Sequence, residues 1–408
     1  MESVRVQFPA LRRVHNGHAV AYFDGPGGTQ VPQRVVDAIA DYLLNHNANT
    51  HWVYPSSQET DALLLDARHV YAAFFNARGP EWVSFGQNMT TITFHLARAL
   101  ARQWGAGDEI VVTELDHHGN VDPWRHAAAD AGVTVRTVPL AADGVSLDME
   151  AVAATLSPRT RLLAIGAASN AIGTITDVAA AARLARSAGA LVFVDAVHYA
   201  PHELVDVQTI GCDMLACSSY KFYGPHQGIL CARPDLIASL DLPKLRPAPA
   251  QPPDSLETGT QSHEGIVGAA AAVRFLASVA SPGTPDLSTM RTALAGSYAR
   301  LHDDASALTR QLWEGLGDID GVTRHGRAPG QPRTPTVSFV VEGHSSHDVA
   351  ARLVDDGLFV SSGDFYAQTL VERLGHGKDG LVRIGCACYT TSTEIDRLVA
   401  AVARIGKS

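Results

Sequence analysis

The sequence is poor in cysteine and positive charge and lacks long apolar runs, and each shortage excludes a class of protein. Its five cysteines are an odd count in 408 residues and lack paired metal-ligand spacing, so we expect a reducing, cytoplasmic setting and no metal site. The net charge of -10, with no Lys/Arg run, argues against a nucleic-acid partner. No apolar run reaches the ~20 residues of a membrane helix, and residues 1–10 lack a signal-peptide core.

What the chain does have is aliphatic sequence that alternates between strand-like and helical patterns. It is 46% hydrophobic, rich in Ala, Val and Leu, and long enough for two domains. Helical patterns separate most of the apolar runs, which are Glu109–Thr113, Val133–Val138, Leu162–Ile165, Leu191–Val194, Met214–Cys217 and Ile229–Cys231. This alternation predicts an α/β domain with a mostly parallel sheet, followed by a smaller α+β unit.

Polar and charged residues gather where the predicted strands end. Ligands of parallel sheets bind at the carboxyl ends of the strands, so these residues are candidates for one site. They are His117, His118, Ser169, Asn170, Asp195, His198 and Lys221.

The segment Ser218–Pro225 places Lys221 between aromatic residues at a strand end. Desolvation there lowers the pKa of a lysine and frees its amine to act as a nucleophile in a Schiff base. The alternative is a lysine exposed at the protein surface, which is the common case for a lysine in a loop. The residues around Lys221 are what favour a functional role.

Two glycine-containing turns are candidates for close approach to a ligand. After the strand Glu81–Phe85, the turn Gly86–Thr91 leads into a helix, which would point free N–H groups at an anion. A simple strand–helix connection is the alternative, because neither a P-loop nor a dinucleotide fingerprint is present. The segment Gly25–Thr29, which contains Gly28, could approach a ligand or form a plain turn.

Five segments in the right order resemble the class V aminotransferases, fold-type I proteins that depend on pyridoxal 5′-phosphate. They are Asp116–Asn120 with Pro123–Trp124, Ser169–Thr174, Val194–His198, Ser218–Pro225 and Glu257–Thr260. The chain is most similar to the cysteine desulfurase and selenocysteine lyase group. The resemblance implies a large domain over 15–280 with a mostly parallel seven-stranded sheet. Residues 1–14 and 281–408 would form the small domain.

The resemblance also implies roles around the cofactor ring. Lys221 would bind the cofactor as an imine and move the substrate's α-proton, and Asp195 would pair with the pyridine nitrogen. His117 resembles the residue that stacks on the ring, with its neighbour His118 as the alternative. Asn170 and His198 would bond the phenolic oxygen. Desulfurases usually carry glutamine at the position of His198, and a histidine there is similar to kynureninase-like members.

The same resemblance predicts which residues bind the cofactor's phosphate and the substrate. The phosphate would sit on the backbone of Asn88, Met89 and Thr90, with Ser218 and Tyr220 beside it. Thr260 would complete this site from a neighbouring subunit, which implies a homodimer. Residues expected to bind the substrate, a small amino acid, are Arg383, Gly28 and Tyr366, with Arg383 holding the carboxylate.

One departure from the desulfurase pattern bears on the reaction. The segment 360–367, where that group carries its sulfur-accepting cysteine, holds Tyr366 at this position and Ser361 in place of an arginine. Cys386 and Cys388 alternate with Ala387 on a predicted strand, so we expect them to be buried. We therefore expect C–S β-elimination or aminotransferase chemistry without a persulfide. The alternatives are a desulfurase that uses Cys386 or Cys388, an epimerase, and a non-catalytic scaffold.

Overall fold

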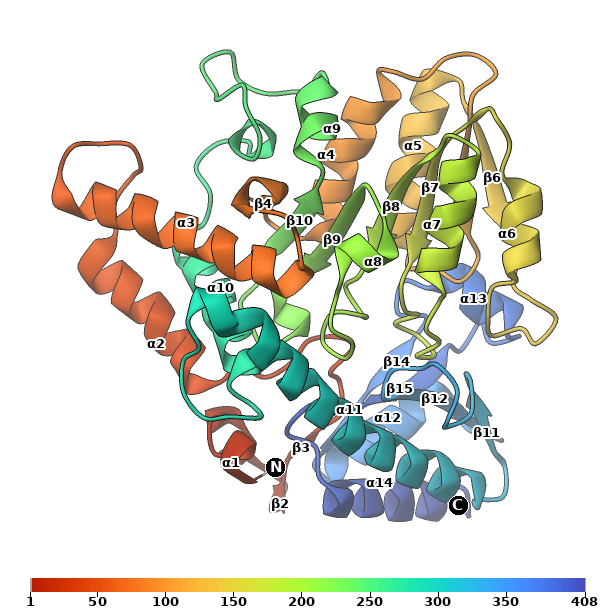
Figure 1. Ribbon diagram of the computed structural model, residues 1–408. Helices are drawn as coiled ribbons and strands as arrows, with labels where there is room; N and C mark the ends of the chain where they lie inside the picture. Colours follow the sequence, from red (N-terminus) through yellow and green to blue (C-terminus); the bar gives the residue numbers. More distant parts are fainter. Residues whose placement is uncertain (1, 408) are drawn as a thin grey trace.

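A seven-stranded sheet organises the large domain in the computed structural model, which describes residues 2–407 (Figure 1). The strand order is β4-β10-β9-β8-β7-β5-β6. The sheet is parallel from β9 to β6, whereas β10 is antiparallel to both β4 and β9, so the predicted mostly parallel sheet is confirmed. The strands are β4 (Val83–Gly86), β5 (Glu109–Thr113), β6 (Thr134–Val138), β7 (Thr160–Gly166), β8 (Leu191–Asp195), β9 (Met214–Ser218) and β10 (Gly228–Ala232).

Helices cover both faces of this sheet because each buried strand sends alternate side chains to opposite sides. In β9, Leu215 and Cys217 join the core cluster formed with α3, α7 and α10. Met214 and Ala216 join the cluster on the other face, formed with α4, α5 and α9. The helices of this part are α2 (Gln33–Asp41), α3 (Pro55–Phe75), α4 (Met89–Ala101), α5 (Asp122–Ala131), α6 (Met149–Thr155), α7 (Val178–Ser187), α8 (Val207–Ile210), α9 (Pro234–Ser239) and α10 (His263–Ala277).

The C-terminal unit is a four-stranded antiparallel sheet with helices packed against it. Its order is β11-β12-β15-β14, and the strands are β11 (Val322–His325), β12 (Thr336–Val341), β14 (Ser361–Gly363) and β15 (Leu381–Gly385). Its helices are α11 (Leu287–Gly317), α12 (Ser346–Asp355), α13 (Gln368–Arg373) and α14 (Ser392–Ile405). Within residues 2–407, no helix combines the length and the apolar character needed to cross a bilayer.

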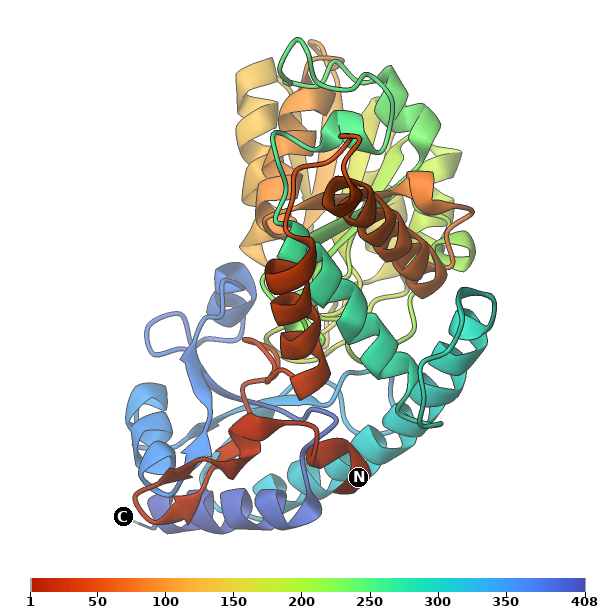
Figure 2. The ribbon, with the colours of Figure 1, turned by 90° about the vertical axis from the view of Figure 1, so that its left-hand side faces the viewer.

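The N-terminal segment packs against the C-terminal unit (Figure 2). It contains α1 (Glu2–Arg5), β1 (Val14–His15), β2 (His18–Ala19) and β3 (Ala21–Tyr22). The strand β3 pairs in parallel with β13 (Leu358–Phe359), and Phe23 lies in the core of that unit. The resemblance implied that the N-terminal part of the small domain ends at residue 14. These contacts show that the N-terminal segment is packed against the C-terminal unit as far as Phe23. The exact domain boundary stays a prediction.

Candidate active site

The predicted strand-end residues surround one cavity of about 1140 Å³. The carboxyl ends of the parallel strands form its floor, the start of α4 forms one wall, and residues 362–366 with Arg383 form the side nearest the small domain. The predicted residues that line it are Asn88, Met89, Thr90, His117, His118, Asn170, Asp195, His198, Ser218, Tyr220, Lys221, Tyr366 and Arg383. Residues far apart in the sequence therefore share one site.

Lys221 projects into this cavity from the turn that follows β9. Its Nζ donates hydrogen bonds to the carbonyl oxygens of Pro26 and Gly27, at 2.5 and 2.9 Å. Burial lowers the pKa of Lys221 to about 8, and the nearby positive charge of Arg383 adds to the effect. A substantial fraction of this amine is therefore neutral near pH 8, as a nucleophile requires.

Asp195, at the end of β8, offers a carboxylate at the bottom of the cavity. One of its oxygens accepts a hydrogen bond from the Val197 N–H at 2.8 Å. No group in residues 2–407 is hydrogen-bonded to the other oxygen. Burial raises the pKa of Asp195 to about 7, although the Val197 N–H and Lys221 oppose the shift. A cationic nitrogen beside the free oxygen would favour the charged carboxylate, which fits a protonated pyridine ring.

A second buried carboxyl group, Asp116, lies in the same wall, and sequence reasoning gave it no role. It accepts hydrogen bonds from the Gly166 N–H at 2.8 Å and from Asn120 Nδ2 at 3.1 Å. Trp124 Nε1 in turn donates to Asn120 Oδ1 at 3.1 Å. Burial raises the pKa of Asp116 to about 8, and the proximity of Asp195 adds to the rise. The sequence signals were its position directly before the two histidines and its place in the segment Asp116–Asn120, which carries part of the family resemblance.

The two adjacent histidines are held differently. His117 Nδ1 accepts a hydrogen bond from the Gly119 N–H at 2.8 Å, which leaves the ring proton on Nε2. Burial lowers the pKa of His117 to about 4, so the ring is neutral. The ring of His118 is bonded instead to Asp122 and Thr369, at 2.9 and 3.2 Å. This geometry favours His117 as the ring that meets a bound cofactor, and the assignment stays a prediction.

Asn170 and His198 form the wall that faces the small domain. Asn170 Nδ2 donates to the Phe365 carbonyl oxygen at 2.9 Å, while its Oδ1 is buried without a partner in the described chain. His198 Nε2 lies 3.0 Å from the hydroxyl oxygens of both Thr334 and Thr336. Burial lowers the pKa of His198 well below its usual range.

The start of α4 holds an N–H group that is available to an anion. Asn88 caps the helix by accepting from the Thr91 N–H at 2.9 Å. The Met89 N–H donates to Ser218 Oγ at 3.0 Å. This N–H, one of the groups expected to bind the phosphate, is therefore already bonded to Ser218. The Thr90 N–H has no acceptor in residues 2–407. A phosphate at this helix start would bind that group and draw on the helix dipole.

Arg383, on β15, is buried and held on several sides. Its guanidinium donates to Asp24 Oδ1 and Ser361 Oγ, at 3.0 and 3.1 Å. The Phe365 ring lies 4.0 Å from its central carbon, and its Nε is buried without a partner among the described residues. The free Nε and the fixed guanidinium plane suit a substrate carboxylate. The pairing with Asp24 was not visible in the sequence, because the two residues come from opposite ends of the chain.

The segment 360–367, where the resemblance predicts a missing cysteine, contains a strained aromatic turn. Phe365 and Tyr366 both have φ of +57°, a left-handed conformation that is unfavourable for bulky residues. The Tyr366 carbonyl oxygen accepts from the His118 N–H at 2.7 Å, which anchors the turn. The Tyr366 ring centroid lies 5.5 Å from that of His117, and the residue is 74% exposed. Tyr366 therefore stands at the mouth of the cavity.

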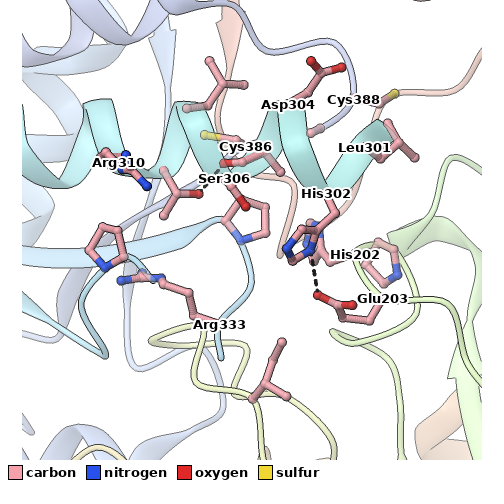
Figure 3. A pocket seen from close by; sticks show the side chains of 18 of the residues that line it. His202, Glu203, Leu301, His302, Asp304, Ser306, Arg310, Arg333, Cys386 and Cys388 are labelled. Carbon is pink, nitrogen blue, oxygen red and sulfur yellow. Dashed lines mark hydrogen bonds and ion pairs between the residues drawn. The ribbon is translucent and has the colours of Figure 1, made fainter. Parts of the chain in front are cut away.

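Cys386 and Cys388 face a different cavity, of about 480 Å³, which lies between α11 and the loops around His202 and Arg333 (Figure 3). Both thiols are buried, as expected, and burial raises the pKa of each to about 12. Of the residues that the structure describes, no cysteine lines the cavity that contains Lys221. A thiolate nucleophile is therefore unavailable beside Lys221 in this arrangement.

Three of the predicted residues lie outside the Lys221 cavity. Ser169 does not line the cavity, although its neighbours Ala168 and Asn170 do. Gly28 is not among the residues that line it, although Pro26 and Gly27 are. Thr260 is exposed and lines a smaller adjacent cavity that also contains Asn88 and Thr91. Within a single subunit Thr260 thus lies near the start of α4, and its contribution to a neighbouring site stays a prediction.

Comparison with known proteins identifies the family of this chain. Residues 21–398 match the family model described as aminotransferase class-V. A cysteine desulfurase of Pectobacterium atrosepticum is 32% identical over 99% of this chain and 98% of its own length. A probable cysteine desulfurase of Halobacterium salinarum is 33% identical over 98% and 95%, respectively. The apo structure of a cysteine desulfurase from Thermococcus onnurineus covers 100% of this chain and 98% of its own, with a TM-score of 0.89 and 27% identity.

The fold and the lysine-bearing cavity define a fold-type I pyridoxal-phosphate enzyme. More narrowly, the chain belongs to the aminotransferase class-V family and is similar to cysteine desulfurases. Pyridoxal 5′-phosphate is the cofactor of this family. The residues present fit that group: a lysine with a lowered pKa, a buried carboxylate with a free oxygen, and a free N–H at a helix start.

Proposed function

We propose that this protein is a pyridoxal-phosphate-dependent lyase that eliminates a β-substituent from a small amino acid without forming a persulfide. The observation that carries the proposal is a cavity that holds a poised lysine and, among its described lining residues, no thiol. When bound, the cofactor accepts the electron pair that remains after the substrate's α-proton is removed. The protein must then supply a base, a carboxylate clamp and a polar environment for the leaving group.

Each of these tasks has a residue suited to it. Lys221 would hold the cofactor covalently and accept the α-proton at Nζ once displaced, and Asp195 would hold the pyridine nitrogen. Arg383 would bind the α-carboxylate through its guanidinium, which lines the cavity. His117 carries its proton on Nε2, and its ring centroid lies 5.5 Å from that of Tyr366, so each residue has a polar hydrogen to offer near the mouth of the cavity. These groups would solvate a departing anion such as hydrosulfide.

The names of the relatives favour a second candidate, a desulfurase, and the placement of the thiols in this chain argues against it. A desulfurase transfers the substrate's sulfur to a protein thiol and releases alanine. Cys386 and Cys388 would have to reach the substrate from a separate cavity, with thiols whose pKa is raised to about 12. Aminotransferase and epimerase chemistry share the same first proton transfer, so product analysis must separate them.

The products distinguish these reactions. Elimination from L-cysteine, with uptake of one water, gives pyruvate, ammonia and hydrogen sulfide. We expect pyruvate and ammonia in equal amounts, formed without an added 2-oxo acid, and no product from Lys221→Ala. Alanine together with protein-bound sulfur would refute the proposal in favour of desulfuration. Activity that depends on a 2-oxo acid would identify an aminotransferase. A panel of small amino acids run in parallel identifies the substrate.

We also propose that the working unit is a homodimer in which Thr260 reaches the phosphate site of the other subunit. The exposure of Thr260, which leaves it open to contact with a second subunit, supports this arrangement. A mixture of Lys221→Ala and Thr260→Ala subunits tests it. Hybrid dimers would contain one site with both defects and one with neither, so activity should exceed that of either parent. Mixed subunits that exchange but gain no activity would contradict a shared site.

A further inference from the structure

We propose that Thr334 and Thr336 fix His198 as the tautomer protonated on Nδ1, so that its ring donates a hydrogen bond into the cofactor cavity. The two threonines are thus positioning residues for the cofactor's phenolic oxygen, acting through His198. The role toward the cofactor rests on the proposed place of His198 beside that oxygen. The tautomer of His198, in contrast, follows from hydrogen bonds within this chain alone.

The assignment follows from counting hydrogens around His198 Nε2. Both threonine hydroxyl oxygens lie 3.0 Å from this nitrogen, and both residues are fully buried. Thr334 Oγ1 can also donate to the Gly173 carbonyl oxygen, at 3.4 Å. Thr336 Oγ1 has no other partner in residues 2–407, so its hydrogen is satisfied only by Nε2. Nε2 is therefore an acceptor, and a neutral imidazole then carries its proton on Nδ1.

The surroundings keep the ring neutral. His198 is 4% exposed and has no carboxylate partner among the described residues. The charged or titratable groups that act on it are His202, Arg383 and Lys221, and each disfavours a second proton on the ring. The His202 ring packs edge-to-face against it at 5.3 Å. His198 also lines the Lys221 cavity, where its Nδ1 has no acceptor from the described part of the chain.

The threonines are themselves held by one contact between the two domains and by others within the C-terminal unit. The Thr334 N–H donates to the Gly173 carbonyl oxygen at 2.8 Å, across the domain junction. The Arg333 guanidinium donates to the carbonyl oxygens of Thr334 and Thr336, at 3.3 and 2.5 Å. It also lies 4.9 Å from the Trp313 ring on α11. The start of β12 therefore connects the C-terminal unit to His198 at the edge of the cofactor cavity.

Removing the Thr336 hydroxyl should reverse the tautomer. In Thr336→Val, the remaining partner of Nε2 is Thr334, whose hydrogen can go to Gly173, so Nε2 would carry the proton and donate to the Thr334 oxygen. Nδ1 would then face the cavity as an acceptor and repel an anionic phenolic oxygen. Losing a donor to a charged oxygen should raise the pKa of the visible cofactor band by about one unit and weaken cofactor binding about tenfold.

The experiment compares Thr336→Val with Thr336→Ser, which keeps the hydroxyl. Thr174→Val is the matched control, because its buried hydroxyl has no partner in the described chain. The first readout is the ¹⁵N spectrum of labelled histidine in protein with and without pyridoxal phosphate, with the His198 signals identified by their loss in His198→Gln. The second readouts are the pH titration of the visible band and the cofactor dissociation constant.

We expect Nδ1 protonation in the wild type, Thr336→Ser and Thr174→Val, and Nε2 protonation with the shifted band in Thr336→Val. Wild-type protein with His198 protonated on Nε2 would overturn the proposal, as would a Thr336→Val variant that keeps the wild-type tautomer. The spectrum of the cofactor-free protein separates this result from the proposed function. A wild type that binds no cofactor refutes that function, whereas the tautomer in the same sample still decides the role of Thr336.

Discussion

The Asp24–Arg383 ion pair leads to a prediction about substrate affinity. Asp24 holds the guanidinium that we expect to bind the substrate carboxylate, with its oxygen 3.0 Å from the arginine nitrogen. An internal carboxylate at this position competes with an incoming one. Replacing Asp24 by asparagine keeps the shape of the side chain and removes its charge. The backbone contacts of Asp24 with Gly27, Gly28 and Gly385 do not depend on that charge.

The size of the effect follows from the exposure of the pair. The Arg383 side chain is 4% exposed and that of Asp24 is 44% exposed, so solvent screens the attraction in part. A half-exposed pair of this kind is worth about 1 kcal/mol, which corresponds to about a fivefold change in affinity. We therefore expect Asp24→Asn to bind a competing carboxylate about fivefold more tightly.

The assay uses propionate as a competitive inhibitor, because it carries a carboxylate but no amine to react with the cofactor. Propionamide is the neutral control ligand, and its inhibition constant should not change. Asp364→Asn is the matched variant, since Asp364 also lines the cavity but forms no ion pair with Arg383. An unchanged propionate constant in Asp24→Asn would refute the competition. An equal gain in Asp364→Asn would show that only the net charge of the cavity matters.

Three further predictions concern the lysine, the cysteines and the phosphate site. Burial lowers the pKa of Lys221 from 10.5 to about 8, so between these values the unfolded chain binds more protons and wild-type stability rises with pH. Near pH 7, cofactor-free Lys221→Met should therefore have a free energy of unfolding about 3 kcal/mol larger than that of the wild type, and this difference should disappear as the pH approaches 10. Thermal unfolding at a series of pH values measures it, and a difference that does not change with pH would contradict the shifted pKa. The double variant Cys386→Ala, Cys388→Ala should keep its turnover, measured as product release, and lost turnover with an intact fold would revive the desulfurase. Thr260→Ala should bind the cofactor with a dissociation constant about tenfold higher and lose it on dialysis. The neighbouring control variant, Thr258→Ala, should bind it as the wild type does.

Most of the site could be predicted from the sequence because its residues follow parallel strands. Apolar runs identify such strands, and their carboxyl ends meet at one edge of the sheet. The strand contexts of Asp195 and Lys221 are therefore enough to place these two residues together. The mostly parallel sheet could also be predicted, since the alternation of strands and helices is a local pattern, whereas the count of seven strands was implied by the family resemblance. The short strand β11 could not, because Val322–His325 has no distinct apolar periodicity and depends on pairing with β12.

Contacts between distant segments were beyond sequence reasoning. The pairing of Asp24 with Arg383 joins the two ends of the chain, and that of His198 with Thr336 arises only when the two domains meet. The left-handed backbone of Phe365 and Tyr366 was equally hidden, because neither residue type favours that conformation.

Gly28 shows how far a glycine turn can be interpreted from sequence. The turn Gly25–Thr29 indicates close approach to a ligand, and it does reach the Lys221 cavity. The sequence does not say which of its residues faces inward, because that depends on the path of the backbone. Pro26 and Gly27 line the cavity, whereas Gly28 does not.

The contact between the N-terminal segment around Asp24 and β15 has a consequence for folding during synthesis. Asp24 leaves the ribosome early, but Arg383 emerges only when translation is nearly finished, and β3 must likewise wait for β13. The half that holds Lys221 and Asp195 can fold while synthesis continues, since domains fold as units from the N-terminal side. A nascent chain halted before β15 would thus present the cofactor pocket without the arginine that recognises an amino acid.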